Sequence, residues 1–229
     1  MSDTTSSESP NVLSRLPPWV SRWLGYRSIP EPDLPPWNNN IWSWVGAFCE
    51  LSVIAAIFGH SVYFTSRNVP VLLPSFGASA AFIYGNHDAP SSQPRALVGG
   101  HFLGALVGVC TMKLFHMASD FEDLRWLSSG IACATTIVLM ELTHTMHPPA
   151  GATAIIPTVT VQATALGWYY LPVVLLSSIL SLTVALLINN IQRKYPAFWL
   201  TSRPGPILPL HCGYKDTDEG KSSERRADL

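Results

Sequence analysis

The chain has 229 residues, of which 48% are hydrophobic and only 13% are charged. A soluble domain carries about 25% charged residues, so this chain has roughly half the charge that a water-facing surface needs. The formal net charge of −1 offers no basic surface for nucleic acid. The composition therefore excludes a soluble enzyme and a nucleic-acid binder, and it favours an integral membrane protein.

The charged residues are unevenly placed along the chain. Residues 1–40 hold 7 of them, residues 41–190 hold only 10, and residues 191–229 hold 12. We therefore expect three parts, namely a disordered or interfacial N-terminal segment over 1–40, a transmembrane domain over 41–200 and a polar C-terminal tail over 201–229.

Four apolar runs are long enough to cross a hydrocarbon core of about 30 Å. They cover about residues 41–64, 96–117, 126–143 and 168–190. Two shorter apolar segments, about 69–84 and 147–160, are interrupted by proline and glycine, which is typical of broken or re-entrant helices. The predicted fold is an all-α, polytopic membrane protein with four transmembrane helices and two short broken or re-entrant segments in two repeated halves.

Positive charges before the first run and after the last predict that both ends of the chain lie on the same side, which is the cytoplasmic side or, in an organelle, the matrix or stromal side. This rule does not separate four crossings from six. With four crossings, the connections 65–68 and 86–95 face the same side and the halves are parallel. With six crossings, these connections face opposite sides and the halves are inverted.

The two short segments resemble each other. Residues 74–80 and 148–154 both fit the pattern Pro-x-x-Gly-Ala-[Ser/Thr]-Ala. Interrupted hydrophobic segments at corresponding positions in two halves of a membrane protein are typical of a transporter binding site. The alternative is that these stretches of small residues only allow tight packing of helices.

A helix that begins at a proline leaves unpaired N–H groups at its start, and these groups and the helix dipole attract anions. Two such starts, with nearby hydroxyl groups, would form a compact site for a small anion. We expect histidines to line the path and an arginine to draw anions to one mouth. The candidate binding residues are Pro74, Ser75, Gly77, Ser79, Arg95, His101, His147, Pro148, Pro149, Gly151 and Thr153.

Titratable residues inside apolar runs are costly, and they usually face a cavity or a partner. Glu50, Glu141 and His144 are candidates for proton coupling, and Glu141 with His147 suggests a pH-sensitive gate beside the second helix start. No metal-ligand spacing, phosphate loop, nucleophile elbow or pair of catalytic carboxylates is present. We therefore expect neither enzymatic activity nor a metal or cofactor.

Small residues recur every four positions in the second long run, at Ala96, Gly100, Gly104 and Gly108. Such a stripe favours close helix contact. The contact can lie within the chain or join copies of it, so a homo-oligomer formed through Gly100, Gly104 and Gly108 is one interpretation.

The string from His147 to Ala154, His-Pro-Pro-Ala-Gly-Ala-Thr-Ala, resembles the signature of the HPP family of integral membrane proteins. Residues 74–80, 93–101, 166–168 and 189–196 resemble further motifs of that family in the same order, so the resemblance covers about residues 41–200. It implies a domain of four transmembrane helices. Plant chloroplast and cyanobacterial members are implicated in nitrite transport, so the resemblance also implies movement of nitrite or a related anion.

Two functions remain open at this stage. The first is a transporter or channel for a small inorganic anion in the lipid bilayer. The second is a membrane scaffold or sensor that transports nothing and assembles through the small-residue face. The sequence does not indicate which membrane holds the protein.

Overall fold

The computed structural model describes residue 13 and residues 16–26 and 35–200, and it is helical, with no strand in these ranges. Most of the expected disordered or interfacial segment and the whole polar tail over 201–229 lie outside the described residues. Within the N-terminal segment, the structure describes a short helix, α1 (Pro18–Trp23).

Four long helices correspond to the four predicted apolar runs. They are α2 (Pro36–His60), α5 (Pro94–Phe115), α6 (Phe121–Leu142) and α9 (Tyr170–Gln192). The first begins about five residues earlier than predicted, because a proline occupies its first turn, where no N–H donor is needed.

Length and hydropathy support three membrane spans among the described residues, over Trp37–His60, Pro94–Phe115 and Val161–Gln192. Helix α6 is 22 residues long but is not among them. It carries Glu122 and Asp123 in its first turn and several hydroxyl residues further on.

The two short apolar segments are short helices that begin at the predicted prolines. Helix α4 covers Pro74–Gly85, and α7 covers Pro149–Val159 with Pro148 as its N-cap. Four smaller elements connect the main helices, namely α3 (Val62–Thr65), the 3-10 turn η2 (Pro90–Ser92), α8 (Val161–Leu166) and the 3-10 turn η3 (Gly167–Tyr169).

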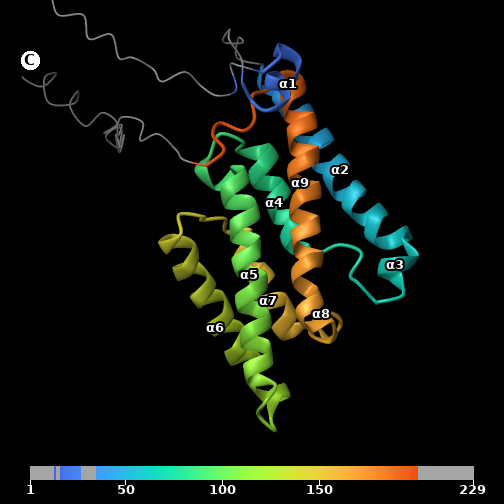
Figure 1. Cartoon of the computed structure of the whole chain (residues 1–229), viewed down its shortest axis with the longest axis vertical. Coiled ribbons are helices and arrows are strands. Elements are labelled where there is room, and N and C mark those ends of the chain that lie inside the picture. Colours follow the sequence, from blue (N-terminus) through green and yellow to red (C-terminus); the bar gives the residue numbers. More distant parts are fainter. Residues whose placement is uncertain (1–12, 14–15, 27–34, 201–229) are drawn as a thin grey trace, which may run out of the picture.

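Helices α4 and α7 run in opposite directions from the middle of the structure. As Figure 1 shows, α2 leads from the α1 end to α3 at the other end, and a non-helical stretch then returns to the middle, where α4 begins. Helix α4 continues to the α1 end. After α6, another non-helical stretch leads inward to the start of α7, which runs towards α8. Each broken segment therefore connects one end of the structure to the other.

Helix α5 lies at the centre of the bundle and packs against α6, α7 and α9. Its most apolar window is 56% buried, against 22% for α2, so α2 presents most of its surface outwards. The largest hydrophobic cluster joins α2, α4, α5 and α9 through residues that include Ile54, Phe58, Phe76, Val109 and Tyr170.

The glycine face of α5 packs against α7 and the stretch before it. A Cβ atom on Gly104 would overlap the carbonyl oxygen of Ala150, and one on Gly108 would lie 2.5 Å from the carbonyl oxygen of Ala154. Only glycine allows the two backbones to approach so closely. This corrects the interpretation that Gly100, Gly104 and Gly108 join two copies of the chain, because α7 and its preceding residues already cover that face.

Candidate functional site

Four buried polar side chains, from three helices and the stretch before α7, form one hydrogen-bonded group, which we call the histidine cluster: Ser79, His101, His147 and Thr153. Ser79 Oγ lies 2.8 Å from Nε2 of His101 and 2.9 Å from Nε2 of His147. Nδ1 of His101 lies 2.8 Å from Oγ1 of Thr153. All four side chains belong to residues with no solvent exposure.

The broken helices bring these residues together. Ser79 lies on α4, Thr153 lies on α7, and His147 lies two residues before Pro149, where α7 begins. His101 projects from α5, and its ring stacks on Phe76 with the ring centroids 4.4 Å apart. Gly100 makes room for His147, because a Cβ atom on Gly100 would lie only 2.8 Å from Cβ of His147.

The hydrogen-bond directions in the histidine cluster follow from one fixed acceptor. Nδ1 of His147 lies 2.7 Å from the carbonyl oxygen of Ser91, which can only accept, so this nitrogen carries a proton. Ser79 has one hydroxyl proton and two acceptors within reach, Nε2 of His147 and the carbonyl oxygen of Ser75 at 3.1 Å. While the His147 ring is neutral, its Nε2 has no proton of its own, so the Ser79 proton lies between these two atoms. His101 must therefore donate to Ser79 from Nε2, and its Nδ1 accepts from Thr153.

The side chains that were expected to offer free hydrogen-bond donors to an anion instead use those donors to bond to one another. Ser79, His101, His147 and Thr153 do meet, but they bond to one another. Ser75 lies one helical turn before Ser79 and is also buried. Its Oγ has no hydrogen-bond partner within the described residues.

The proline and glycine candidates have structural positions that differ from one another. Pro74, Pro148 and Pro149 lie at the starts of α4 and α7. A Cβ atom on Gly77 would meet nothing within 4 Å, whereas one on Gly151 would lie 3.3 Å from Sγ of Cys133 on α6. Gly151 therefore supports helix packing, and Gly77 borders open space.

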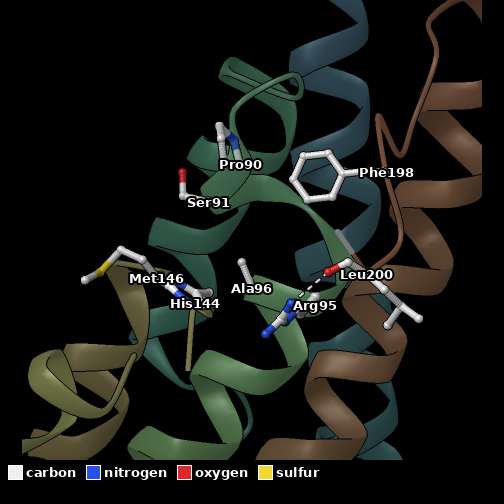
Figure 2. Close-up of a pocket in the computed structure, with 8 residues that line it drawn as sticks. All are labelled: Pro90, Ser91, Arg95, Ala96, His144, Met146, Phe198 and Leu200. Atoms are coloured by element: carbon white, nitrogen blue, oxygen red, sulfur yellow. Dashed lines mark hydrogen bonds between the residues drawn. The ribbon is translucent and has the colours of Figure 1, made fainter. Parts of the chain in front are cut away.

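A pocket lies at the end of the structure where α5 begins, next to the histidine cluster. It has a volume of about 520 Å³. Figure 2 shows Arg95 and His144 on its wall, together with Ser91, the residue whose carbonyl accepts from His147. The lining residues are Pro90, Ser91, Arg95, Ala96, His144, Met146, Phe198 and Leu200.

Arg95 supplies the fixed positive charge of this pocket. Its guanidinium donates to the carbonyl oxygens of Leu200 at 2.9 Å and Thr143 at 2.7 Å, the first of which is drawn in Figure 2. These carbonyls are uncharged, and in the described part of the chain no carboxylate lies within 4 Å of Arg95. His87 does not line the pocket; burial lowers its pKa, Asp88 opposes this effect and Arg193 adds to it.

The three residues predicted to couple protons lie in three different places. Glu50 is fully buried on α2, and its Oε1 accepts from Ser181 of α9 at 2.5 Å. Its Oε2 and the hydroxyl of Tyr84 interact with each other electrostatically, but neither forms a hydrogen bond of normal geometry among the described residues. Glu141 is exposed at the end of α6, and His144 lines the Arg95 pocket.

Two features of the site had no signal in the sequence. Ser91 acts through its main-chain carbonyl, so its side-chain type carries no information. Phe198 and Leu200 reach the pocket because the chain folds back after α9. The described residues contain no group of three or more His, Cys, Asp or Glu side chains arranged to hold a metal ion.

Comparison with known proteins agrees with this architecture. The family model for the HPP transmembrane region matches residues 32–196. The chain belongs to the HPP family. This HPP-family chain is also 36% identical to two transmembrane proteins of Dictyostelium discoideum, over 185 and 186 residues. Each alignment covers 79% of this chain, but only 63% and 57% of the relatives, respectively.

No solved structure matches this HPP-family chain. The family, the two transmembrane relatives and the three apolar helices together identify an integral, multi-pass membrane protein. The chain spans about three fifths of the length of these relatives. Their names describe them as transmembrane proteins and state no activity.

Proposed function

We propose that this HPP-family protein moves a small inorganic anion across the membrane, with nitrite as the leading candidate. The observation that carries the proposal is the Arg95 pocket. Its guanidinium bonds to neutral carbonyls alone among the described residues, and it faces a cavity at the start of a long helix. On this proposal the protein is a transporter or channel and has no enzymatic activity.

The chemistry of Arg95 suits a small oxyanion. A guanidinium has five N–H donors in a planar fork, and hydrogen bonds to two carbonyls leave donors for a ligand. The amino end of α5 adds partial positive charge beside Ala96. His144 on the same wall adds a ring nitrogen that can donate a hydrogen bond. A planar anion such as nitrite fits this donor set, and the likeness to the HPP family supports the same choice.

Substitution of Arg95 tests this proposal. We expect Arg95→Gln to weaken apparent nitrite affinity in proteoliposomes by about tenfold or more, because charge-assisted hydrogen bonds are worth about 1.5–3 kcal/mol. Arg67→Gln is the matched control, since Arg67 is exposed and bonds to the carbonyl of Tyr63 away from the pocket. Equal uptake by wild type and Arg95→Gln would contradict the proposal.

We also infer that the chain crosses the membrane six times in two inverted halves. The support is the opposite course of α4 and α7, and the position of α3 and η2 at opposite ends of the structure. Each half then contains a long helix, a broken crossing with a short helix, and another long helix.

Single cysteines at Asn68 and Asp88 test this topology in a variant that lacks the native cysteines. Both positions lie in connections between helices. A membrane-impermeant maleimide should label them from opposite sides of a sealed vesicle. Labelling of both from one side would instead indicate four crossings with re-entrant segments.

The alternative function, a scaffold or sensor that assembles through the small-residue face of α5, needs that face to be exposed. The glycine face that would join two copies is covered by α7 within one chain. Anion transport through the Arg95 pocket is therefore better supported than a scaffold role.

A further inference from the structure

We propose that the histidine cluster holds one exchangeable proton beside the anion pocket, so that the protein binds an anion and a proton together. This inference rests on the proposed anion function and names its coupling ion. The cluster was expected to bind the anion, whereas its geometry assigns it to the proton.

The first argument is that the neutral cluster has one defined arrangement of ring protons. Because Ser91 can only accept, the order of donors runs from Thr153 to His101 and then to Ser79, whose hydroxyl proton His147 shares. The two rings must therefore be opposite tautomers. His101 carries its proton on Nε2, and His147 carries its proton on Nδ1.

The second argument is that the cluster can accept one more proton without losing a partner. A proton added to Nε2 of His147 reverses its contact with Ser79, so that both rings donate to Ser79 Oγ. The hydroxyl proton of Ser79 then turns to the carbonyl oxygen of Ser75, which lies 3.1 Å away. In the neutral arrangement Ser79 shares its proton between His147 and the Ser75 carbonyl. The added proton on His147 leaves the Ser79 proton wholly to that carbonyl. The proton comes from water in the pocket and returns there by the reverse step.

The groups around the histidine cluster do not neutralise the positive charge of this added proton. From α9, the hydroxyl of Tyr170 donates to the carbonyl of Thr153 at 2.9 Å. From α6, Cys133 lies near Gly151. From α2, Glu50 bonds to Ser181. No carboxylate among the described residues bonds to either ring, so a protonated cluster has no anionic partner of its own.

The Arg95 pocket supplies that partner. Ser91 lines the pocket and accepts from His147, so a charged His147 ring lies one residue behind the pocket wall. His144 and Arg95 lie on the same wall. An anion in the pocket stabilises the proton on the cluster, and the proton stabilises the anion, because opposite charges attract strongly where water is excluded. Binding of the two is therefore mutually favourable.

Nitrogen-15 NMR of the full chain in lipid bilayers, with labelled histidine, tests the proton arrangement without any transport. At neutral pH we expect opposite tautomers, with His101 protonated on Nε2 and His147 on Nδ1. At lower pH, one of the two rings should become doubly protonated while the other stays neutral. Identical tautomers at neutral pH, or simultaneous charging of both rings, would overturn the proposal.

A serine variant separates proton storage from general packing. Ser79→Ala removes the hydroxyl that joins the rings, so the fixed pair of tautomers and the single charging step should be lost. Ser178→Ala is the matched control, because Ser178 is equally buried and, in the described part of the chain, its hydroxyl bonds only to the carbonyl of Val174 one turn away. The control should keep the wild-type spectrum. An unchanged spectrum in Ser79→Ala would contradict the proposal.

Proton movement in proteoliposomes distinguishes failure of this inference from failure of the anion function. With a pH dye inside the vesicles and protein-free vesicles as the blank for nitrous acid, we expect protein-dependent nitrite uptake to acidify the interior. Ser79→Ala should lose the acidification. Nitrite uptake without acidification would overturn proton coupling alone, whereas absence of nitrite uptake would overturn the anion function.

Discussion

Replacement of Gly104 by leucine is expected to prevent folding of the central helix pair. A single Cβ atom at this position already overlaps the carbonyl oxygen of Ala150, and that oxygen belongs to the backbone of α7, which has no rotamer to change. Overpacking of a core costs about 1–3 kcal/mol even where side chains can move. Because α5 and α7 must separate to admit the leucine, the histidine cluster would also be broken.

Thermal unfolding in detergent measures this effect. We expect Gly104→Leu to lower the midpoint strongly or to yield no monodisperse protein, and Gly104→Ala to lie between it and wild type. Gly130→Ala is the control, since a Cβ atom on this α6 glycine would meet nothing within 4 Å. Equal midpoints for Gly104→Ala and Gly130→Ala would show that the α5–α7 contact is looser than described.

The second large effect is expected at Arg193, a buried arginine just after α9. Its guanidinium donates to the carbonyl of Tyr84 on α4 at 3.0 Å and to the hydroxyl of Ser43 on α2 at 2.9 Å. It also donates to the carbonyl of Asn39 on α2. One side chain thus joins three helices at the end of the structure that carries the pocket.

We expect Arg193→Met to lower the free energy of unfolding by about 1.5–3 kcal/mol, the range for hydrogen bonds made by a charged group. Methionine keeps most of the volume but none of the donors. Lys194→Met removes a charge from the adjacent exposed position and should have little effect. Denaturation of both variants in the same detergent gives the comparison. A smaller loss in Arg193→Met than in Lys194→Met would contradict this role.

The sequence predicts the helices well because their signals are local. Helix starts are expected near Pro74 and Pro148, and α4 begins at Pro74 while α7 begins one residue after Pro148. Long apolar runs mark the four long helices. The direction in which α4 and α7 cross the bundle is not local. It depends on where the non-helical stretches before them lie, and hydropathy alone does not encode that path.

Four of the eleven predicted binding residues meet in the structure, and their role as binding residues stays a prediction. Ser79, His101, His147 and Thr153 are all found together, as their motifs indicate. Whether these side chains bond to one another depends on the distances between their helices, which the sequence does not give. Residues that were expected to bind an anion are therefore found bonded to one another. The role of Ser91 depends on a main-chain carbonyl, and the role of Arg193 depends on the ends of two other helices, so neither follows from residue type.

The amino ends of the two short helices have an electrical consequence. Helices α4 and α7 begin in the middle of the bundle, where Ser79 and Thr153 reach the same histidine ring. Each helix start carries about half a positive charge, and the two add at that depth because the helices point away from each other. We expect sodium and potassium to meet a barrier there, so the proposed passage of an anion would not bring with it a cation leak that discharges the membrane potential.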